Sequence, residues 1–142
     1  MRILSVVGQT GAGKSTLMAA LAKELDRQHR RVVALRDGEL YKKVLQCTDL
    51  NSLSGILRTA PECDLLLVEG MGLSGVPKVE VYRSNGGSRP LFEADSADRR
   101  DWIVVVTDSH SLTAPCQVLR FTDTIWIHLL SGMVWDRSKV LT

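Results

Sequence analysis

The stretch Gly8-Gln9-Thr10-Gly11-Ala12-Gly13-Lys14-Ser15-Thr16 decides the fold class of this sequence. From Gly8 to Ser15 it matches the pattern G-x-x-x-x-G-K-[ST], in which a glycine-rich loop wraps a phosphate. The loop follows the apolar run Arg2–Val7 and opens the segment Lys14–His29, whose apolar residues recur at helical spacing. A strand, a glycine loop and an amphipathic helix in this order are the context that supports a phosphate-binding loop (P-loop).

Each residue type in this loop has a physical task. Glycines allow successive backbone N–H groups to converge on phosphate oxygens, and the helix N-terminus adds positive potential. We expect Lys14 to reach the β- and γ-phosphates and Ser15 to bind Mg²⁺. Thr16 at this position is more often a packing residue than a ligand. The predicted nucleotide-binding residues of the loop are Gly8, Gln9, Thr10, Gly11, Ala12, Gly13, Lys14, Ser15 and Thr16. A strand–helix turn without a ligand is the alternative interpretation.

Further apolar runs alternate with helical segments along the rest of the chain. We predict buried strands at 32–35, 65–68 and 103–106, a further strand at 119–121, and helices at 38–46, 49–59 and from Thr122-Asp123, as a cap, through Leu130. Alternation in Pro77–Arg83 predicts a half-exposed strand, which we interpret as an added antiparallel strand. The pattern as a whole predicts an α/β three-layer fold with a mostly parallel central sheet, similar to P-loop NTPases.

Two acidic residues follow predicted strands and are candidates for the metal side of the site. Glu69 ends the run 65–69, where a Walker-B carboxylate would face the γ-phosphate and the metal, and Asp37 follows the second strand. We therefore predict Lys14 and Glu69 as catalytic residues and Ser15, Glu69 and Asp37 as Mg²⁺ ligands. The alternatives are a solvated strand-end acid for Glu69 and a turn acid before a glycine for Asp37.

Composition narrows the possible functions. The chain has 142 residues, which fits one domain, so residues 1–142 are taken as a single nucleotide-binding domain. A net charge of +2 is too small to indicate nucleic acid or a membrane surface as a partner. Neither a signal peptide nor a membrane-spanning apolar run is visible, so the cytoplasm is the expected compartment.

Cysteine and histidine usage predicts no second chemical site. The three cysteines are widely spaced and predict free thiols in a reducing compartment, not a disulfide framework or a zinc site (Cys47, Cys63, Cys116). The three histidines show no mutual spacing that suggests a base or a ligand pair (His29, His110, His128).

The stretch Asp64–Asp108 resembles the molybdopterin-guanine dinucleotide biosynthesis protein B family (MobB). The residues that carry the resemblance are Asp64-Leu65-Leu66-Leu67-Val68-Glu69-Gly70, Pro77-Lys78-Val79-Glu80-Val81-Tyr82-Arg83, Arg89-Pro90 and Val104-Val105-Val106-Thr107-Asp108. The P-loop is widely shared, whereas the combination of L-V-E-G with P-K-x-E-V-x-R is specific. The resemblance implies a GTP-binding accessory protein, dimeric and weakly hydrolytic, that assists the enzyme joining a guanine nucleotide to molybdopterin.

This sequence also departs from the MobB pattern. Arg36-Asp37-Gly38-Glu39 stands where the family has a His-rich segment, the segment before the third strand is shorter, and Met71-Gly72 replaces a lysine after L-V-E-G. Two alternatives therefore stay open. One is an ATP-dependent small-molecule enzyme resembling dethiobiotin synthetase. The other is a degenerate nucleotide-binding partner protein without turnover.

The choice of base and the assembly state follow from weaker signals. No N-K-x-D motif is present, so a preference for GTP over ATP rests on the resemblance, with Asp108 as the candidate reader of guanine N1 and N2 hydrogens. We expect a homodimer, because Pro77–Arg83 and the apolar residues of 125–133 exceed what one element buries.

Overall fold

Parallel strands form the centre of the protein. The computed structural model describes residues 1–141, and within them seven strands form one sheet, six of them in the order β2-β3-β1-β4-β5-β6. All five pairings along this path are parallel. The six strands are β1 (Arg2–Gly8), β2 (Val32–Leu35), β3 (Leu65–Glu69), β4 (Lys78–Tyr82), β5 (Trp102–Thr107) and β6 (Gln117–Arg120).

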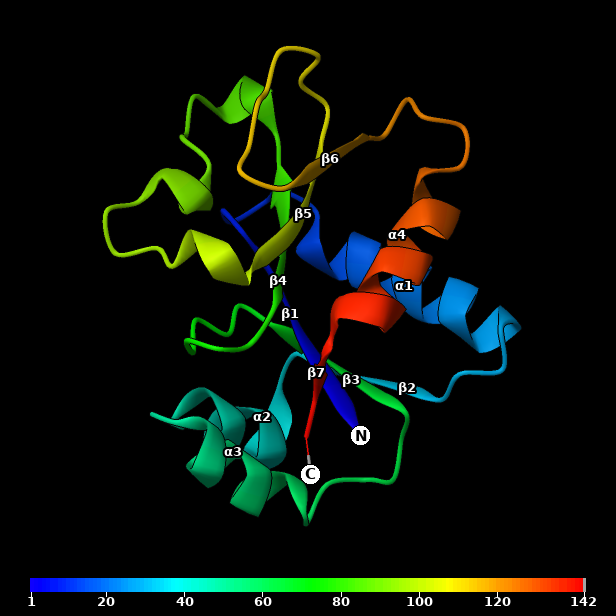
Figure 1. Ribbon diagram of the computed structural model, residues 1–142, viewed down its shortest axis with the longest axis vertical. Helices are drawn as coiled ribbons and strands as arrows, with labels where there is room; N and C mark the ends of the chain where they lie inside the picture. The colour runs from blue at the N-terminus through cyan, green and yellow to red at the C-terminus, as the bar shows by residue number, and fades with distance from the viewer. Residues whose placement is uncertain (142) are drawn as a thin grey trace.

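Helices cover both faces of this sheet, which confirms the predicted α/β three-layer fold. Figure 1 shows α1 (Lys14–Arg27) and α4 (Trp126–Arg137) together on one side, and α2 (Gly38–Leu45) and α3 (Leu50–Leu57) on the other. On the first side, Leu17, Leu21 and Leu130 belong to one buried cluster, and Leu53 belongs to the cluster on the opposite side. Each helix therefore buries one apolar stripe against the sheet. The longest described helix, α1, has 14 residues, and none within residues 1–141 is long and apolar enough to cross a lipid bilayer.

The layer formed by α2 and α3 has a third element, which is an irregular segment and not a helix. Residues 84–101 contain three short 3₁₀ turns, at Ser84–Gly86, Leu91–Glu93 and Arg99–Asp101. Phe92 from this segment packs with Val7 of β1 and with Trp102 and Val105 of β5. Because side chains alternate along a strand, Val7 lies on the same face of β1 as Ile3, which belongs to the cluster under α2 and α3. The segment therefore continues the layer of α2 and α3 toward the end of β1.

The prediction for Pro77–Arg83 was wrong in orientation and exposure. β4 is parallel to both β1 and β5, and Lys78 through Val81 are buried. The charged residues that suggested an exposed face, Lys78 and Glu80, are 3% and 0% exposed. Each is buried because it has partners: Lys78 Nζ lies 3.2 Å from Asp101 Oδ2, and Glu80 accepts hydrogen bonds from three N–H groups.

The antiparallel strand is β7 (Lys139–Val140), which pairs with Arg2 and Ile3 at the start of β1. β4 pairs with β1 only from Ser5 onward, so this part of β1 is available to a returning strand.

The predicted cap at Thr122-Asp123 was also wrong, since α4 begins at Trp126 and runs to Arg137. Asp123 Oδ2 instead accepts from the backbone N–H of Arg120 at 2.9 Å, which closes the turn after β6.

Candidate functional site

The P-loop connects the end of β1 to the start of α1, as the sequence predicted. Two of its glycines hold backbone positions that a side chain would disturb. A Cβ on Gly8 would lie 2.6 Å from the carbonyl oxygen of Val81, so glycine lets β4 approach closely. Gly13, the residue before α1, has φ of 100°, in the region that favours glycine. The turn between them is closed by a hydrogen bond from Ala12 N to Gln9 O at 3.0 Å.

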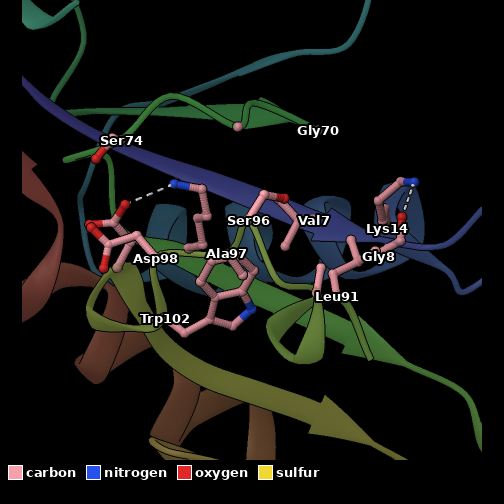
Figure 2. A pocket seen from close by; sticks show the side chains of 14 residues that line it. Val7, Gly8, Lys14, Gly70, Ser74, Leu91, Ser96, Ala97, Asp98 and Trp102 are labelled. Carbon is pink, nitrogen blue, oxygen red and sulfur yellow. Dashed lines mark hydrogen bonds and ion pairs between the residues drawn. The ribbon is translucent and has the colours of Figure 1, made fainter. Parts of the chain in front are cut away.

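Lys14 is the first residue of α1 and bends back over the loop. Its Nζ donates to the carbonyl oxygen of Gly8 at 2.7 Å, shown as a dashed line in Figure 2. An ammonium group at this place, together with the N–H groups at the start of α1, gives the loop a positive potential suited to phosphate. Ser15 follows in the first turn of α1 and is partly buried, whereas Thr16 is exposed.

The predicted metal-side acids lie at the same edge of the sheet as the loop. Glu69 pairs with Val6 of β1, two residues before the loop begins, and its side chain is 23% exposed. Asp37 is the exposed residue that precedes α2 and follows β2. Sequence reasoning missed Arg36, whose Nε lies 4.0 Å from Glu69 Oε2. Arg36 therefore offers Glu69 a cationic partner that competes with a metal ion for the carboxylate.

Tyr41 of α2 fixes the end of β3. Its hydroxyl donates to the carbonyl oxygen of Glu69 at 2.6 Å. Burial raises the pKa of Tyr41 above its usual range, and the charge of Glu69 adds to the effect. The phenol therefore stays protonated at neutral pH and keeps its donor role. This contact joins α2, which Asp37 precedes, to the strand that carries Glu69.

The residues present fit a magnesium ion held mainly by a nucleotide. Mg²⁺ takes oxygen ligands, keeps several waters and needs only one or two protein oxygens beside phosphates. The hydroxyl of Ser15 and the carboxylates of Glu69 and Asp37 are donors of that type. Among the described residues, no three His, Cys, Asp or Glu side chains gather as a metal cage.

Asp108, the candidate base reader, follows β5 and holds a neighbouring loop. Its Oδ1 accepts from the backbone N–H of Ser84 at 2.9 Å and from the Ser84 hydroxyl at 3.0 Å. The hydrogen bond from the Ser84 backbone is the main reason that the pKa of Asp108 is lowered from its usual value. The group is therefore a carboxylate at neutral pH, and its Oδ2 makes no hydrogen bond with the described residues. Recognition of a base by Asp108 stays a prediction.

Arg83 reaches the P-loop, and sequence reasoning did not assign it to the site. Its Nε donates to the carbonyl oxygen of Ala12 at 3.2 Å, and its guanidinium lies 4.0 Å from the ring centre of Phe121. The stacking fixes the plane of the guanidinium and leaves its remaining N–H groups beside the loop. The available signal was position: Arg83 comes directly after β4, the strand next to β1.

A cavity of about 590 Å³ lies beside the P-loop, on the sheet face opposite α1. Figure 2 shows Gly8 and Lys14 at one end of it, Ser74 and Asp98 at the other, and the ring of Trp102 between them. Its walls come from the loop after β3 and from the irregular segment 91–101. No sequence signal for this cavity was recognised, because its walls are irregular loops.

The strand, the glycine loop and α1 together define a P-loop α/β protein. No family model matches this chain, and no curated protein matches its sequence. Among solved structures, it has the fold of the MobB proteins. A MobB homolog from Bacillus stearothermophilus is 21% identical with a TM-score of 0.63, over 96% of this chain and 100% of that one. MobB of Bacillus subtilis is 17% identical with a TM-score of 0.62, over 94% and 97%. At these identities the likeness establishes the fold.

Proposed function

We propose that this protein is a cytoplasmic, MobB-like GTP-binding accessory protein with weak GTPase activity, acting in the biosynthesis of molybdopterin guanine dinucleotide. The observation that carries the proposal is a P-loop with Lys14 at the start of α1, in a chain whose fold matches MobB proteins over nearly its whole length.

The proposal gives each polar group of the site a role. Backbone N–H groups from Gly11 to Ser15 surround the phosphates, and Lys14 neutralises charge on the β- and γ-phosphates. Ser15 and Glu69 hold the metal side, with Asp37 contributing from the end of β2. Mg²⁺ bound there supplies charge neutralisation at the phosphates.

A second candidate function is supported by the cavity beside Lys14. A small-molecule enzyme needs room for a second substrate next to the terminal phosphate, and about 590 Å³ is within the range of such sites, roughly 300–1,000 Å³. The ATP-dependent enzyme resembling dethiobiotin synthetase is therefore kept as the alternative. A nucleotide-binding partner without turnover would leave the same P-loop and no measurable hydrolysis.

Titration with GTP and with ATP, each with and without Mg²⁺, tests the proposal. GTP is expected to bind more tightly, and Asp108→Asn is expected to narrow the gap, because an amide cannot accept both guanine hydrogens as a carboxylate does. Asn can still accept from Ser84 through its oxygen, so the loop contact survives the substitution. Equal affinity for the two nucleotides in the unmodified protein would favour the ATP-dependent alternative, and no binding of either would refute both.

A further inference from the structure

We propose that the cavity beside Lys14 is a binding site for a second small molecule, one with an apolar or planar body and amino or hydroxyl groups that donate hydrogen bonds. The proposal rests on the proposed function only in taking the P-loop to hold a triphosphate. It adds a ligand that the P-loop itself does not require.

The cavity lies where a ligand would meet the terminal phosphate. Lys14 and Gly8 line its near end, and Lys14 is the loop residue that contacts β- and γ-phosphates. Asp108, the candidate base reader, and Arg83, which reaches the loop, do not line it. Arg83 instead lines a separate hollow of about 90 Å³ against the loop, together with Gln9 and Asn85. A ligand in the larger cavity would therefore lie beyond the phosphates and not in the place of the base.

Two buried charged residues of β4 hold the walls of the cavity in place. Lys78 Nζ donates to Leu73 O and Val76 O, each at 2.9 Å, and to Asp101 Oδ2 at 3.2 Å. These bonds join the loop after β3 to the end of the segment 91–101. The opposite wall depends on Glu80, whose carboxylate accepts from Leu91 N at 2.6 Å.

Glu80 also accepts from Phe92 N at 3.1 Å and from Trp102 Nε1 at 3.0 Å. A fully buried carboxylate is costly to desolvate, so its retention in this strand needs these three donors. Both walls are therefore tied to the same central strand. Buried hydrogen bonds to the sheet therefore hold the shape of the cavity.

Hydrogen-bond capacity decides which ligand fits the far end. An ammonium has three hydrogens, and the three acceptors around Lys78 Nζ use all of them. Lys78 thus has no donor left for a ligand. Asp101 and Asp98 keep acceptor capacity, because each carboxylate oxygen offers about two lone-pair directions. Lys14, at the near end, is taken up by the phosphate. The far end then presents these acceptors and the hydroxyls of Ser74 and Ser96.

The middle of the cavity favours an apolar or planar body. Val7, Leu91 and the ring of Trp102 line it. Both carboxylates at the far end are already paired with cations, Asp101 with Lys78 and Asp98 with Arg100, so an anionic group of the ligand would find no free cation there among the described residues. The fitting class is therefore an amine or alcohol with an apolar body, and not a carboxylate or a phosphate.

Three indole compounds that differ only in their terminal group test this assignment. The probes are tryptamine, tryptophol and indole-3-acetate, each titrated into the ¹⁵N-labelled full chain saturated with Mg²⁺ and a non-hydrolysable GTP analogue. We expect saturable shifts at Gly72, Ser96 and Ala97 with tryptamine, at a Kd on the order of 1 mM for a probe of this size. Tryptophol is expected to bind more weakly, and indole-3-acetate not to saturate. Tightest binding by indole-3-acetate would overturn the ligand class.

A blocking variant and a matched control identify the cavity as the site. Gly72 lines it, and a Cβ there meets no atom within 4 Å, so Gly72→Phe is expected to fill the space without backbone strain. Gly55 in α3 also has open space around an added Cβ and does not line the cavity. Gly72→Phe is expected to weaken the binding of tryptamine at least about tenfold, whereas Gly55→Phe is expected to leave this affinity unchanged. Equal tryptamine binding by Gly72→Phe would refute the site.

A second variant keeps the test valid if Gly72→Phe fails to fold. Asp98 is bonded in the described residues only to Arg100, so Asp98→Asn removes charge from the rim and keeps the shape. It is expected to abolish the preference for tryptamine over tryptophol, and an unchanged preference would overturn the role of the carboxylates.

Nucleotide affinity, measured in parallel, is expected to stay within about twofold in every variant. A chain that binds no nucleotide would refute the proposed function, whereas normal nucleotide binding without any probe binding would refute this inference alone.

Discussion

The ammonium group of Lys14 donates to Gly8 O at 2.7 Å, so its charge sits over the loop backbone and outside the core. A charge-assisted hydrogen bond to a phosphate contributes about 1.5–3 kcal/mol, or about 10- to 100-fold in affinity. Lys14→Ala is therefore expected to weaken triphosphate binding by that factor and to leave the melting temperature nearly unchanged. Calorimetric titration measures the first quantity and thermal unfolding the second. Equal affinity in the variant and the unmodified protein would refute the assignment.

Glu69 carries the prediction for the metal side. Glu69→Gln keeps the side-chain shape and removes the charge, so it is expected to weaken Mg²⁺-dependent binding or hydrolysis and to spare metal-free nucleotide binding. Asp37→Asn is expected to act in the same direction but less, because Asp37 is exposed at the start of α2. Nucleotide affinity measured across a Mg²⁺ titration gives both effects.

Arg36 provides the control for this experiment. Its Nε lies 4.0 Å from Glu69 Oε2, so Arg36→Gln frees the carboxylate without altering it. If Glu69 holds the metal side, Arg36→Gln is expected to leave Mg²⁺ dependence intact or to strengthen it. Normal Mg²⁺ dependence in Glu69→Gln would reduce Glu69 to a strand-end acid paired with Arg36.

At the scale of elements, the sequence predicted those whose signals are local. The strand at 32–35 is found with the bounds predicted, and Asp49 caps α3 with a hydrogen bond from Ser52 N at 2.7 Å. The prediction for β4 failed because a charged residue that is buried with a partner looks the same in a sequence as one that is solvated. The ion-pair partner of Lys78 and the three donors to Glu80 lie 11 to 23 residues further along the chain, within or directly after a segment without periodicity.

The same limit explains which parts of the site were found. The P-loop is a contiguous motif whose residues carry the chemistry, so the sequence predicted its place between β1 and α1. Arg83 reaches that loop only through the parallel pairing of β1 with β4, and the cavity exists only where two irregular segments meet. Pairings between distant segments are fixed by packing, which one sequence does not display.

Glu80 gives β4 a testable role in holding the segment 91–101. Glu80→Ala leaves the N–H groups of Leu91, Phe92 and the Trp102 indole without their acceptor in a buried place. We expect the free energy of unfolding to fall by roughly 3–5 kcal/mol, from unsatisfied donors and a void together. Amide hydrogen exchange is expected to increase in residues 91–101 first. An unchanged exchange pattern would show that the segment does not depend on Glu80.

Titration of Glu80 makes stability depend on pH in a defined direction. Burial is the main reason that its pKa is raised above the usual value near 4.5. A raised pKa in the folded state means that the folded protein binds this proton more tightly than the unfolded chain does. Its contribution to stability is therefore complete below about pH 4.5 and is lost as the pH rises through the raised pKa. Relative to Glu80→Gln, which does not titrate, the unmodified protein is expected to lose stability across that window in urea unfolding. A constant difference between the two proteins would contradict this.

At the scale of the whole molecule, the structure changes the basis for expecting a dimer. Most apolar residues of 125–133 pack against the core of α1 and the sheet, so they are not surplus surface (Trp126, Ile127, Leu130, Met133). The strand at 77–83, the other reason for the expectation, is buried within one chain. What stays exposed at this end is Ile125, at 55%, and Leu129, at 40%.

These two residues lie close in sequence to β6, which ends the strand order of the sheet. An edge strand presents unpaired backbone groups, and apolar side chains beside it commonly mark an interface. We therefore still predict a homodimer, now through β6 and the start of α4.

Ile125→Glu with Leu129→Glu is expected to give a monomer, because it places two charges in the contact. Leu45→Glu on α2, where the side chain is 43% exposed, is the matched control and is expected to stay dimeric. Light scattering at micromolar concentration decides between these outcomes. A monomeric unmodified protein would contradict the dimer, and a dimer that survives the double substitution would place the interface elsewhere.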